Sequence, residues 1–381
     1  MILKNATIHT MNDNGDVIEN GFVETDGRII KSVGADNPQE GIDLNGADIY
    51  PGFIDAHSHL GLFTSGVGIE GEDFNEDSDP VTPQLDTKDA IYPFDSSFAD
   101  AISAGVTTSV VSPGSTNTIA GKISAIKTQG KRIDDMLIRT VGMKFSLGEN
   151  PKMTYIDKDS SPVTRMAIAS LIREALSKAK RYMEQKQKAD SIDDEPEFDT
   201  KCEALIPLLK REVKAHFHCH RADDIFTAIR ISKEFNLDCV LIHCTEGHLI
   251  ADELKDENVS CVLGPLLCDR SKPELANLND KNPSILCSKG IDIAICTDHS
   301  EVPVQYLPLS VGVAIKNGLS FSDGLKSITC NAAKAAGIYD RVGSIEAGKD
   351  ADFAIFDSNP FEVMSSPVMV VSDGRIVYER N

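Results

Sequence analysis

The segment PGFIDAHSHLG, residues 51–61, places two histidines, His57 and His59, two residues apart at the end of an apolar run. Successive side chains of a β-strand point to opposite faces, so two residues separated by one share a face. Two imidazoles on one face can hold a single cation, and neutral imidazole is a common ligand of Zn²⁺. The spacing therefore predicts part of a metal site at the end of a strand.

Further metal-competent side chains follow three later strand-like runs. KAHFHCHRADD carries three histidines on one strand face, VLIHCTEGH carries one at the end of an apolar run, and IAICTDHSEVP carries a carboxylate followed by a histidine. The residues concerned are His216, His218, His220, His243, Asp298 and His299. Imidazole nitrogens combined with one or two carboxylates suit Zn²⁺ or a similar divalent ion, so the later runs strengthen the prediction of a metal site.

The elements that would position these side chains are strands that alternate with helices. Between residues 51 and 345, apolar runs such as GVTTSVVSPG and CVLIHC alternate with helix-like segments such as RADDIFTAIRISKEFN. This alternation favours a (β/α)8 barrel, in which active sites lie at the carboxyl ends of the strands. A doubly wound sheet is the alternative, but no GxGxxG follows the first strand. We therefore expect an α/β fold with the histidines at one mouth of a TIM-like barrel.

The two ends of the chain differ from the middle. Residues 1–50 contain short β-like runs between turn signals such as NDNGD and TDGR, and the C-terminal segment contains ADFAIFD and RIVYER. We expect a composite β-sandwich domain from residues 1–50 plus 346–381, and a barrel domain over residues 51–345. The polar segment QKQKADSIDDEPEFDT, residues 185–200, is expected to be a surface insertion of the barrel.

Composition excludes several classes of partner. The formal net charge of the 381 residues is −21, and such an acidic surface repels nucleic acid and anionic membranes. The nine cysteines lie mostly in apolar runs without a CxxC pair, which is typical of reduced thiols in the cytoplasm. The sequence shows neither a signal peptide nor an apolar run of about 18 residues. We expect a cytoplasmic protein with a small-molecule substrate, and homo-oligomerisation stays open.

Taken together, the segments resemble the amidohydrolase superfamily. PGFIDAHSHLG, the histidines of two later strands and CTDH are similar to its metal-binding strands, and VGSIEAGKDADFAIFDSNPFE with VVSDGRIVYER resembles its C-terminal β-domain. Within it, GENPK, HCHRADDI, HCTEGH and GPLLCDRSKPEL are similar to the imidazolonepropionase-like branch. The resemblance covers nearly the whole chain and implies a metal-dependent hydrolase on a distorted (β/α)8 barrel.

The resemblance also implies a ligand set. Its members come from the first, fifth, sixth and eighth strands, and they are His57, His59, His218, His243 and Asp298. Asp298 would be both ligand and general base, and His243 is counted with it as catalytic. His220 is the alternative to His218, because a one-step shift of the strand moves the ligand by two residues.

One ligand of two-metal members has two candidates here. Such members use a carbamylated lysine or a glutamate from a middle strand, and GMKFSLGENPK offers Lys144 and Glu149. We favour Glu149, because it sits where the strand should end, whereas Lys144 is expected to lie deep in the barrel or to point outward. The number of ions, one or two, stays open.

These residues predict a hydrolase that cleaves a C–N bond of an amide, a cyclic amide or a related group. A bound Zn²⁺, or Fe or Mn in its place, lowers the pKa of water to about 7. Asp298 would accept the proton of the attacking water and later deliver it to the leaving nitrogen. Arg221 and Arg270 are candidates to bind a substrate carboxylate, and His220 and His299 are candidates to contact the substrate.

Other functions remain as alternatives. A dipeptidase, an N-acyl amino acid hydrolase or an N-acetyl sugar deacetylase would use the same scaffold. A nucleobase-type deaminase is disfavoured, because HCHRADD has no glutamate after the fifth-strand histidine. A non-catalytic barrel scaffold is the alternative outside enzymes. The polar segment LGLFTSGVGIEGEDFNEDSDP, residues 60–80, is expected to close over the site from the first strand.

Overall fold

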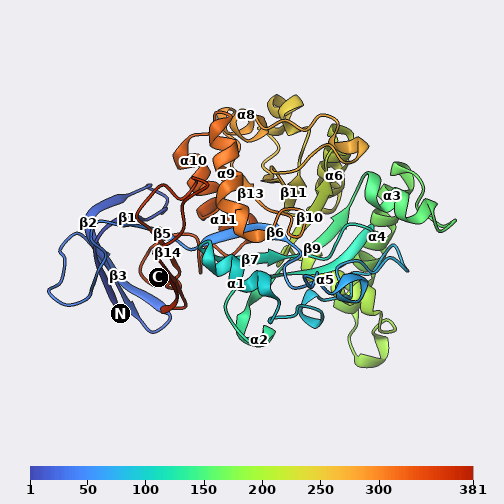
Figure 1. Ribbon diagram of the computed structural model, residues 1–381. Helices are drawn as coiled ribbons and strands as arrows, with labels where there is room; N and C mark the ends of the chain where they lie inside the picture. The colour runs from blue at the N-terminus through green and yellow to red at the C-terminus, as the bar shows by residue number, and fades with distance from the viewer. Residues whose placement is uncertain (381) are drawn as a thin grey trace.

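The computed structural model describes residues 1–380 and contains two sheets of eight strands each. Both ends of the chain contribute to the first sheet, which lies at one side of the molecule (Figure 1). Its order is β16-β15-β14-β5-β1-β2-β3, with β4 paired to β1. The strands are β1 Ile2–His9, β2 Val17–Asp26, β3 Ile29–Gly34, β4 Ile42–Asp43, β5 Asp48–Pro51, β14 Phe353–Phe356, β15 Met369–Ser372 and β16 Arg375–Glu379. The predicted β unit from both termini is confirmed.

The second sheet is the predicted barrel, and its strands pair in chain order from β6 to β13. They are β6 Phe53–Ser58, β7 Val106–Val111, β8 Ile119–Lys127, β9 Leu137–Ser146, β10 Lys214–Cys219, β11 Cys239–His243, β12 Ser260–Leu263 and β13 Ile293–Ile295. The two ends of this sheet meet through backbone hydrogen bonds, from Asp298 N to His57 O at 3.1 Å and from His59 N to His299 O at 2.7 Å. The buried side chain of Asp55 adds to this junction by accepting from the amide of Thr297.

One strand departs from the ideal (β/α)8 pattern. β8 runs antiparallel to both of its neighbours, β7 and β9, whereas the other pairs in the barrel are parallel. Only residues 112–118 connect β7 to β8. A parallel crossover needs a dozen or more residues, while an antiparallel pair can be joined by a short turn. The short connection therefore fixes the reversed direction of β8.

Helices fill the other connections. The α-helices are α1 Ser96–Ser103, α2 Ile133–Met136, α3 Glu149–Ile156, α4 Arg165–Lys188, α5 Thr200–Leu209, α6 Ala222–Phe235, α7 Ala251–Leu254, α8 Asn282–Ser288, α9 Leu307–Lys316, α10 Phe321–Ser327 and α11 Cys330–Ala336. The short 3-10 helices are η1 Gly68–Gly71, η2 Thr87–Asp89, η3 Ile192–Asp194, η4 Gly247–Leu249, η5 Pro273–Leu275 and η6 Val304–Tyr306. Among residues 1–380, no helix combines the length and the apolar character needed to cross a membrane.

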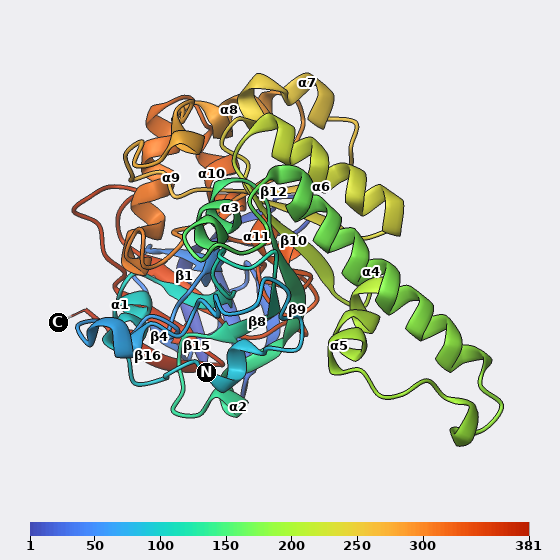
Figure 2. The same ribbon diagram turned by 90° about the vertical axis from the view of Figure 1, so that its right-hand side faces the viewer.

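The longest helix, α4, illustrates how local sequence sets these elements. Thr164 caps its N-terminus by accepting from the amide of Ala167, as hydroxyl side chains at this position commonly do. Its buried residues Ile168, Ile172 and Leu176 recur every four positions and form one apolar stripe toward the barrel. Figure 2 shows the connection from α4 to α5, within residues 185–200, projecting from the body of the molecule.

The interior of the barrel is packed with small and branched apolar side chains. One buried cluster joins strand residues to the alanines of α11, and its strand members include Ile54, Val110, Ile123, Val141, Val240, Val262 and Ala294. Because these residues come from seven of the eight barrel strands, they fill the interior, as expected for a barrel of this size. This packed floor leaves the polar side chains to gather at the carboxyl ends of the strands.

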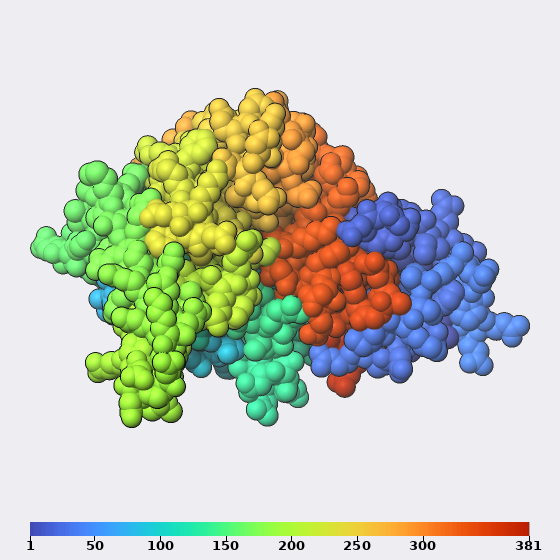
Figure 3. Space-filling view, turned by 180° about the vertical axis from the view of Figure 1, so that it is seen from behind, coloured from blue at the N-terminus to red at the C-terminus, as the bar shows by residue number. Residues whose placement is uncertain are grey.

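A buried ionic cluster ties the barrel to the C-terminal part of the first sheet. Lys127, at the end of β8, is only 1% exposed, and its Nζ lies 2.9 Å from Asp350, 2.5 Å from Asp352 and 3.3 Å from Asp373. Burial alone would lower the pKa of Lys127, but the carboxylates of Asp352 and Asp350 raise it above its usual value. Figure 3 shows an orange-red region, which by its colour includes the residues around α11, between the blue N-terminal residues and the green and yellow residues of the barrel.

Candidate metal centre

The first group of candidate ligands lies where the two ends of the barrel sheet meet. His57 belongs to β6, His59 directly follows it, and Asp298 follows β13. The Nε2 atoms of both histidines are 3.4 Å from Asp298 Oδ1. A tetrahedral ion with ligand distances of about 2.0–2.1 Å holds its ligand atoms about 3.3–3.4 Å apart. The three side chains are therefore spaced as ligands of one ion.

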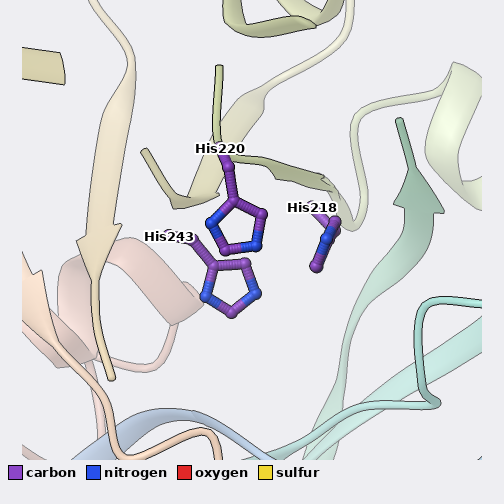
Figure 4. A group of neighbouring side chains, drawn as sticks. All are labelled: His218, His220 and His243. Atoms are coloured by element: carbon purple, nitrogen blue, oxygen red, sulfur yellow. The ribbon is translucent and has the colours of Figure 1, made fainter. Parts of the chain in front are cut away.

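The second group consists of His218, His220 and His243. Figure 4 shows the three rings converging from β10 and β11. The rings of His220 and His243 stack with centroids 4.5 Å apart, and His218 meets His243 edge-on, also at 4.5 Å. One ligand nitrogen of each residue lies within 4.8 Å of the others. Because the Nε2 atoms of His218 and His220 are buried and make no hydrogen bond, the donor set fits a cation.

The backbone is distorted where the strands deliver these side chains. His218 lies opposite Ile242 in the β10–β11 register, so simple alternation would turn His243 to the other face. Instead, His243 has a φ of 73° and Asp298 a φ of 54°. Left-handed backbone is costly for residues that carry a Cβ, and such strain concentrates at functional sites. This distortion accounts for the presence of His243 beside His218.

Carbonyl oxygens fix the orientation of two imidazoles. His59 Nδ1 donates to Ser112 O at 2.7 Å, and His243 Nδ1 donates to Gly264 O at the same distance. A carbonyl can only accept, so Nδ1 carries the proton in each ring and Nε2 keeps a free lone pair. Outer partners of this kind are typical of metal-binding histidines, because they hold the ring in its ligating tautomer.

The charges of the site also suit a cation. Burial lowers the pKa values of His57, His218 and His220 well below the usual value, and it lowers that of His243 to about 4. Burial alone would raise the pKa of Asp298, but His243, with the other nearby histidines, holds it well below its usual range. At neutral pH the site therefore offers neutral imidazoles and an ionised carboxylate.

Lys144, rather than Glu149, lies beside these groups. Its Nζ is buried and lies 3.2 Å from His57 Nε2, and burial lowers its pKa to about 8 against the opposing effect of Asp298. Glu149 is the first residue of α3, and its Oε2 accepts from the amide of Glu274 at 3.2 Å. Gly148, with a φ of 86°, turns the chain before Glu149 and so directs it to the start of a helix. We expected Glu149 at this place, and the structure brings Lys144 there instead.

A cavity of about 330 Å³ opens onto both groups. Its walls come from the loops after several barrel strands, and they are formed by His59, Phe74, Asn75, Ser115, Thr116, Asn150, His218, His220, Pro265, Cys268, Ser271, Lys272, Leu275, Asp298, Ser300 and Glu301. Phe74 and Asn75 belong to the segment 60–80, which thus does reach the cavity. The cavity has room for a substrate the size of a small peptide or a nitrogen heterocycle.

The other predicted substrate contacts lie outside this wall. Arg221 forms a bidentate pair with Asp223 near the surface, and Arg270 donates to the carbonyl of Leu278. His299 is buried, and its Nδ1 accepts from the amide of Val304 at 3.2 Å. Among the predicted contacts, His220 alone is part of the wall.

Two residues that sequence reasoning did not single out face the site. Lys272 and Glu274 follow β12, and they form an ion pair with Nζ 2.8 Å from Oε1. Lys272 lines the cavity, and Glu274 is buried against the second histidine group. The only signal available in the sequence was their position after a barrel strand, where loops carry binding residues in this fold.

A sequence model described as the amidohydrolase family matches residues 49–377 of the chain. The amidohydrolase tasK of Hapsidospora irregularis is 29% identical over 90% of this chain, which spans only 38% of that relative. An imidazolonepropionase of Rhizorhabdus wittichii is 26% identical, and the match covers 93% of this chain and 92% of that relative.

A solved structure is more similar still. The crystal structure of an amidohydrolase from Thermotoga maritima MSB8 superposes with a TM-score of 0.94 and 37% sequence identity, and all of both chains is covered. These comparisons agree with the sequence resemblance and with the barrel that the structure shows.

Proposed function

The chain belongs to the amidohydrolase family, whose hydrolases act on C–N bonds, and we propose that it is a metal-dependent hydrolase of an amide or cyclic amide. The observation that carries this proposal is the pair of convergent ligand groups at one end of the barrel. Both groups face a single cavity, as a hydrolytic centre requires.

The residues present would hold two divalent ions, most simply Zn²⁺, although Fe or Mn would also accept these ligands. The first ion would be held by His57, His59 and Asp298, and the second by His218, His220 and His243. When bound, such ions make a hydroxide-like nucleophile available at neutral pH and polarise the scissile carbonyl.

Asp298 is placed to move the proton. It follows the eighth barrel strand, lines the cavity and stays ionised at neutral pH, so it can accept the proton of the attacking water. The protonated carboxyl can then deliver this proton to the nitrogen of the leaving group, which would otherwise depart as an unstable anion. His59 and His57 hold the carboxylate from the other end of the sheet.

Lys144 would supply a further ligand of the metal centre. We propose that its neutral amine reacts with CO₂ to form a carbamate, releasing one proton. The product carries a carboxylate at the end of a buried chain, and Lys144 already lies beside His57. Besides burial, its charge lowers the pKa values of His218 and His243, which supports a position near the second group as well.

One cation in the cavity wall, Lys272, suits a substrate with an anionic group. Lys272 is the cation that lines the cavity, and it is placed to bind a substrate carboxylate, the role we had assigned to Arg221 and Arg270. N-acyl amino acids, dipeptides and the carboxylate-bearing cyclic amides suggested by the similarity to an imidazolonepropionase all have this feature.

The variant Asp298→Asn tests the proposed chemistry. Asparagine keeps the size of the side chain but cannot accept the proton, so we expect turnover to fall by at least about 10²–10⁴-fold. The assay is hydrolysis of a panel of N-acyl amino acids and cyclic amides by metal-loaded protein, with folding checked by circular dichroism. Undiminished turnover by a folded Asp298→Asn protein would remove Asp298 from the mechanism.

A further inference from the structure

A buried carboxylate outside the expected ligand set lies against the second histidine group. Glu274 belongs to η5, in the loop after β12, and it is 2% exposed. Its Oε1 atom is 3.5 Å from His220 Nε2 and 3.7 Å from His218 Nε2. These separations are too long for hydrogen bonds, and they are close to the spacing of about 3.3–3.4 Å between ligands of one tetrahedral ion.

Two of these atoms lack a partner. His218 Nε2 and His220 Nε2 are buried without a hydrogen-bond partner, while Glu274 Oε1, which faces both, is paired with Lys272 Nζ at 2.8 Å. Buried polar atoms without partners are rare and costly, and two of them facing one carboxylate oxygen indicate a missing partner. A carboxylate oxygen and two imidazole nitrogens all present lone pairs, so that partner must be a cation or a donor.

The rest of the structure holds Glu274 in this position. Its Oε2 accepts from the amide of Glu149 at 3.0 Å, while Glu149 Oε2 accepts from the amide of Glu274 at 3.2 Å. A Cβ at Gly148 would approach Glu274 Oε2 to 2.8 Å, so this glycine leaves room for the carboxylate. These two hydrogen bonds between Glu149 and Glu274 fix the Glu274 side chain, and a metal ligand needs such a fixed position.

Lys272 is the one cation near Glu274 Oε1 in the described part of the chain, with its Nζ at 2.8 Å. The ammonium of Lys272 pairs with the carboxylate, and the Nε2 atoms of His218 and His220 still have no hydrogen-bond partner. A carboxylate oxygen has two lone pairs, and ligating carboxylates are commonly held by an outer donor. Lys272 therefore fits the role of a positioning partner for a ligating Glu274.

We propose that Glu274 is a ligand of the second ion, together with His218, His220 and His243. The inference rests on the proposed metal-dependent function and extends it, because it makes the loop after β12 part of the metal centre. Because Glu274 is paired with Lys272, binding of the second ion by Glu274 would also fix the position of Lys272 in the cavity wall.

The test is a measurement of metal content and affinity in Glu274→Gln, with Glu301→Gln as the matched control. Glutamine keeps the shape but loses the charge, while Glu301 is another carboxylate of the same cavity wall whose side chain belongs to neither ligand group. Each protein is freed of metal, titrated with Zn²⁺ and analysed by elemental mass spectrometry. We expect Glu274→Gln to keep one ion and to bind the second at least about 10–100-fold more weakly, while Glu301→Gln binds both.

If Glu274→Gln does not fold, Glu274→Asp replaces it, because the shorter side chain keeps the charge but withdraws the oxygen from the histidines. Either variant binding two ions with wild-type affinity would overturn the role of Glu274 and leave the proposed function intact. Wild-type protein that binds no ion would overturn the proposed function itself, and the two failures are thus distinguishable.

Discussion

Lys144 offers a prediction whose magnitude follows from the structure. The carbamate forms only from the neutral amine, and burial lowers the pKa of Lys144 to about 8 in the metal-free protein. The neutral fraction is then about one half at pH 8, about one tenth at pH 7 and about one hundredth at pH 6. An exposed lysine, with a pKa near 10.4, would be neutral in only about one part in 250 at pH 8. At constant dissolved CO₂, carbamate formation should therefore slow about fivefold from pH 8 to pH 7 and about tenfold from pH 7 to pH 6.

The assay uses metal-free protein depleted of CO₂, to which ¹³C-labelled CO₂ and Zn²⁺ are added at pH 6, 7 and 8. The carbamate carbon is followed by ¹³C NMR, and recovery of metal binding is followed in parallel. Lys144→Met is the control, because it keeps the buried chain and removes the amine. Label incorporation in Lys144→Met equal to that of wild type, or a rate independent of pH, would refute the reasoning.

Two further predictions concern other buried or cavity-lining cations. Lys127→Met leaves the buried carboxylate of Asp352 without a cation, whereas Asp350 keeps its ion pair with Arg341, so we expect a loss of about 3–5 kcal/mol in unfolding free energy, or about 4–6 °C in melting temperature. Calorimetry compares this loss with that of Lys31→Met, which removes an exposed ion pair with Glu24 that is screened by solvent, and equal shifts would contradict the prediction. Lys272→Met should raise KM about 10–150-fold for a carboxylate substrate, but not for its uncharged amide, in steady-state assays. An equal effect on both substrates would show that Lys272 does not bind the carboxylate.

The sequence was most informative where local pattern and position determine the chemistry. The spacing of His57 and His59 and the alternation of strands and helices were sufficient to predict a barrel with polar residues at one mouth. Both rings do converge on Asp298, although a register shift between Asp55 and Ser58 interrupts the alternation on which the argument relied.

The sequence was least informative where the backbone departs from regular geometry. Alternation could not predict that His243 turns inward, because this depends on a left-handed residue at the strand end. Regular alternation also could not predict the position of Glu149. The chain turns at Gly148, so that Glu149 begins α3 and Lys144 lies at the site instead. Glu274 reaches the histidines from a loop more than fifty residues away in sequence, and only tertiary structure brings such residues together.

The central claim is that the two side-chain groups form a metal centre. Elemental analysis of protein purified without chelator, for wild type and for His57→Ala/His59→Ala, tests it most directly. We predict about two equivalents of Zn, Fe or Mn in wild type and the loss of at least one in the variant. Wild-type protein without metal, even after incubation with Zn²⁺ or Mn²⁺, would contradict the account and favour a barrel that serves as a scaffold.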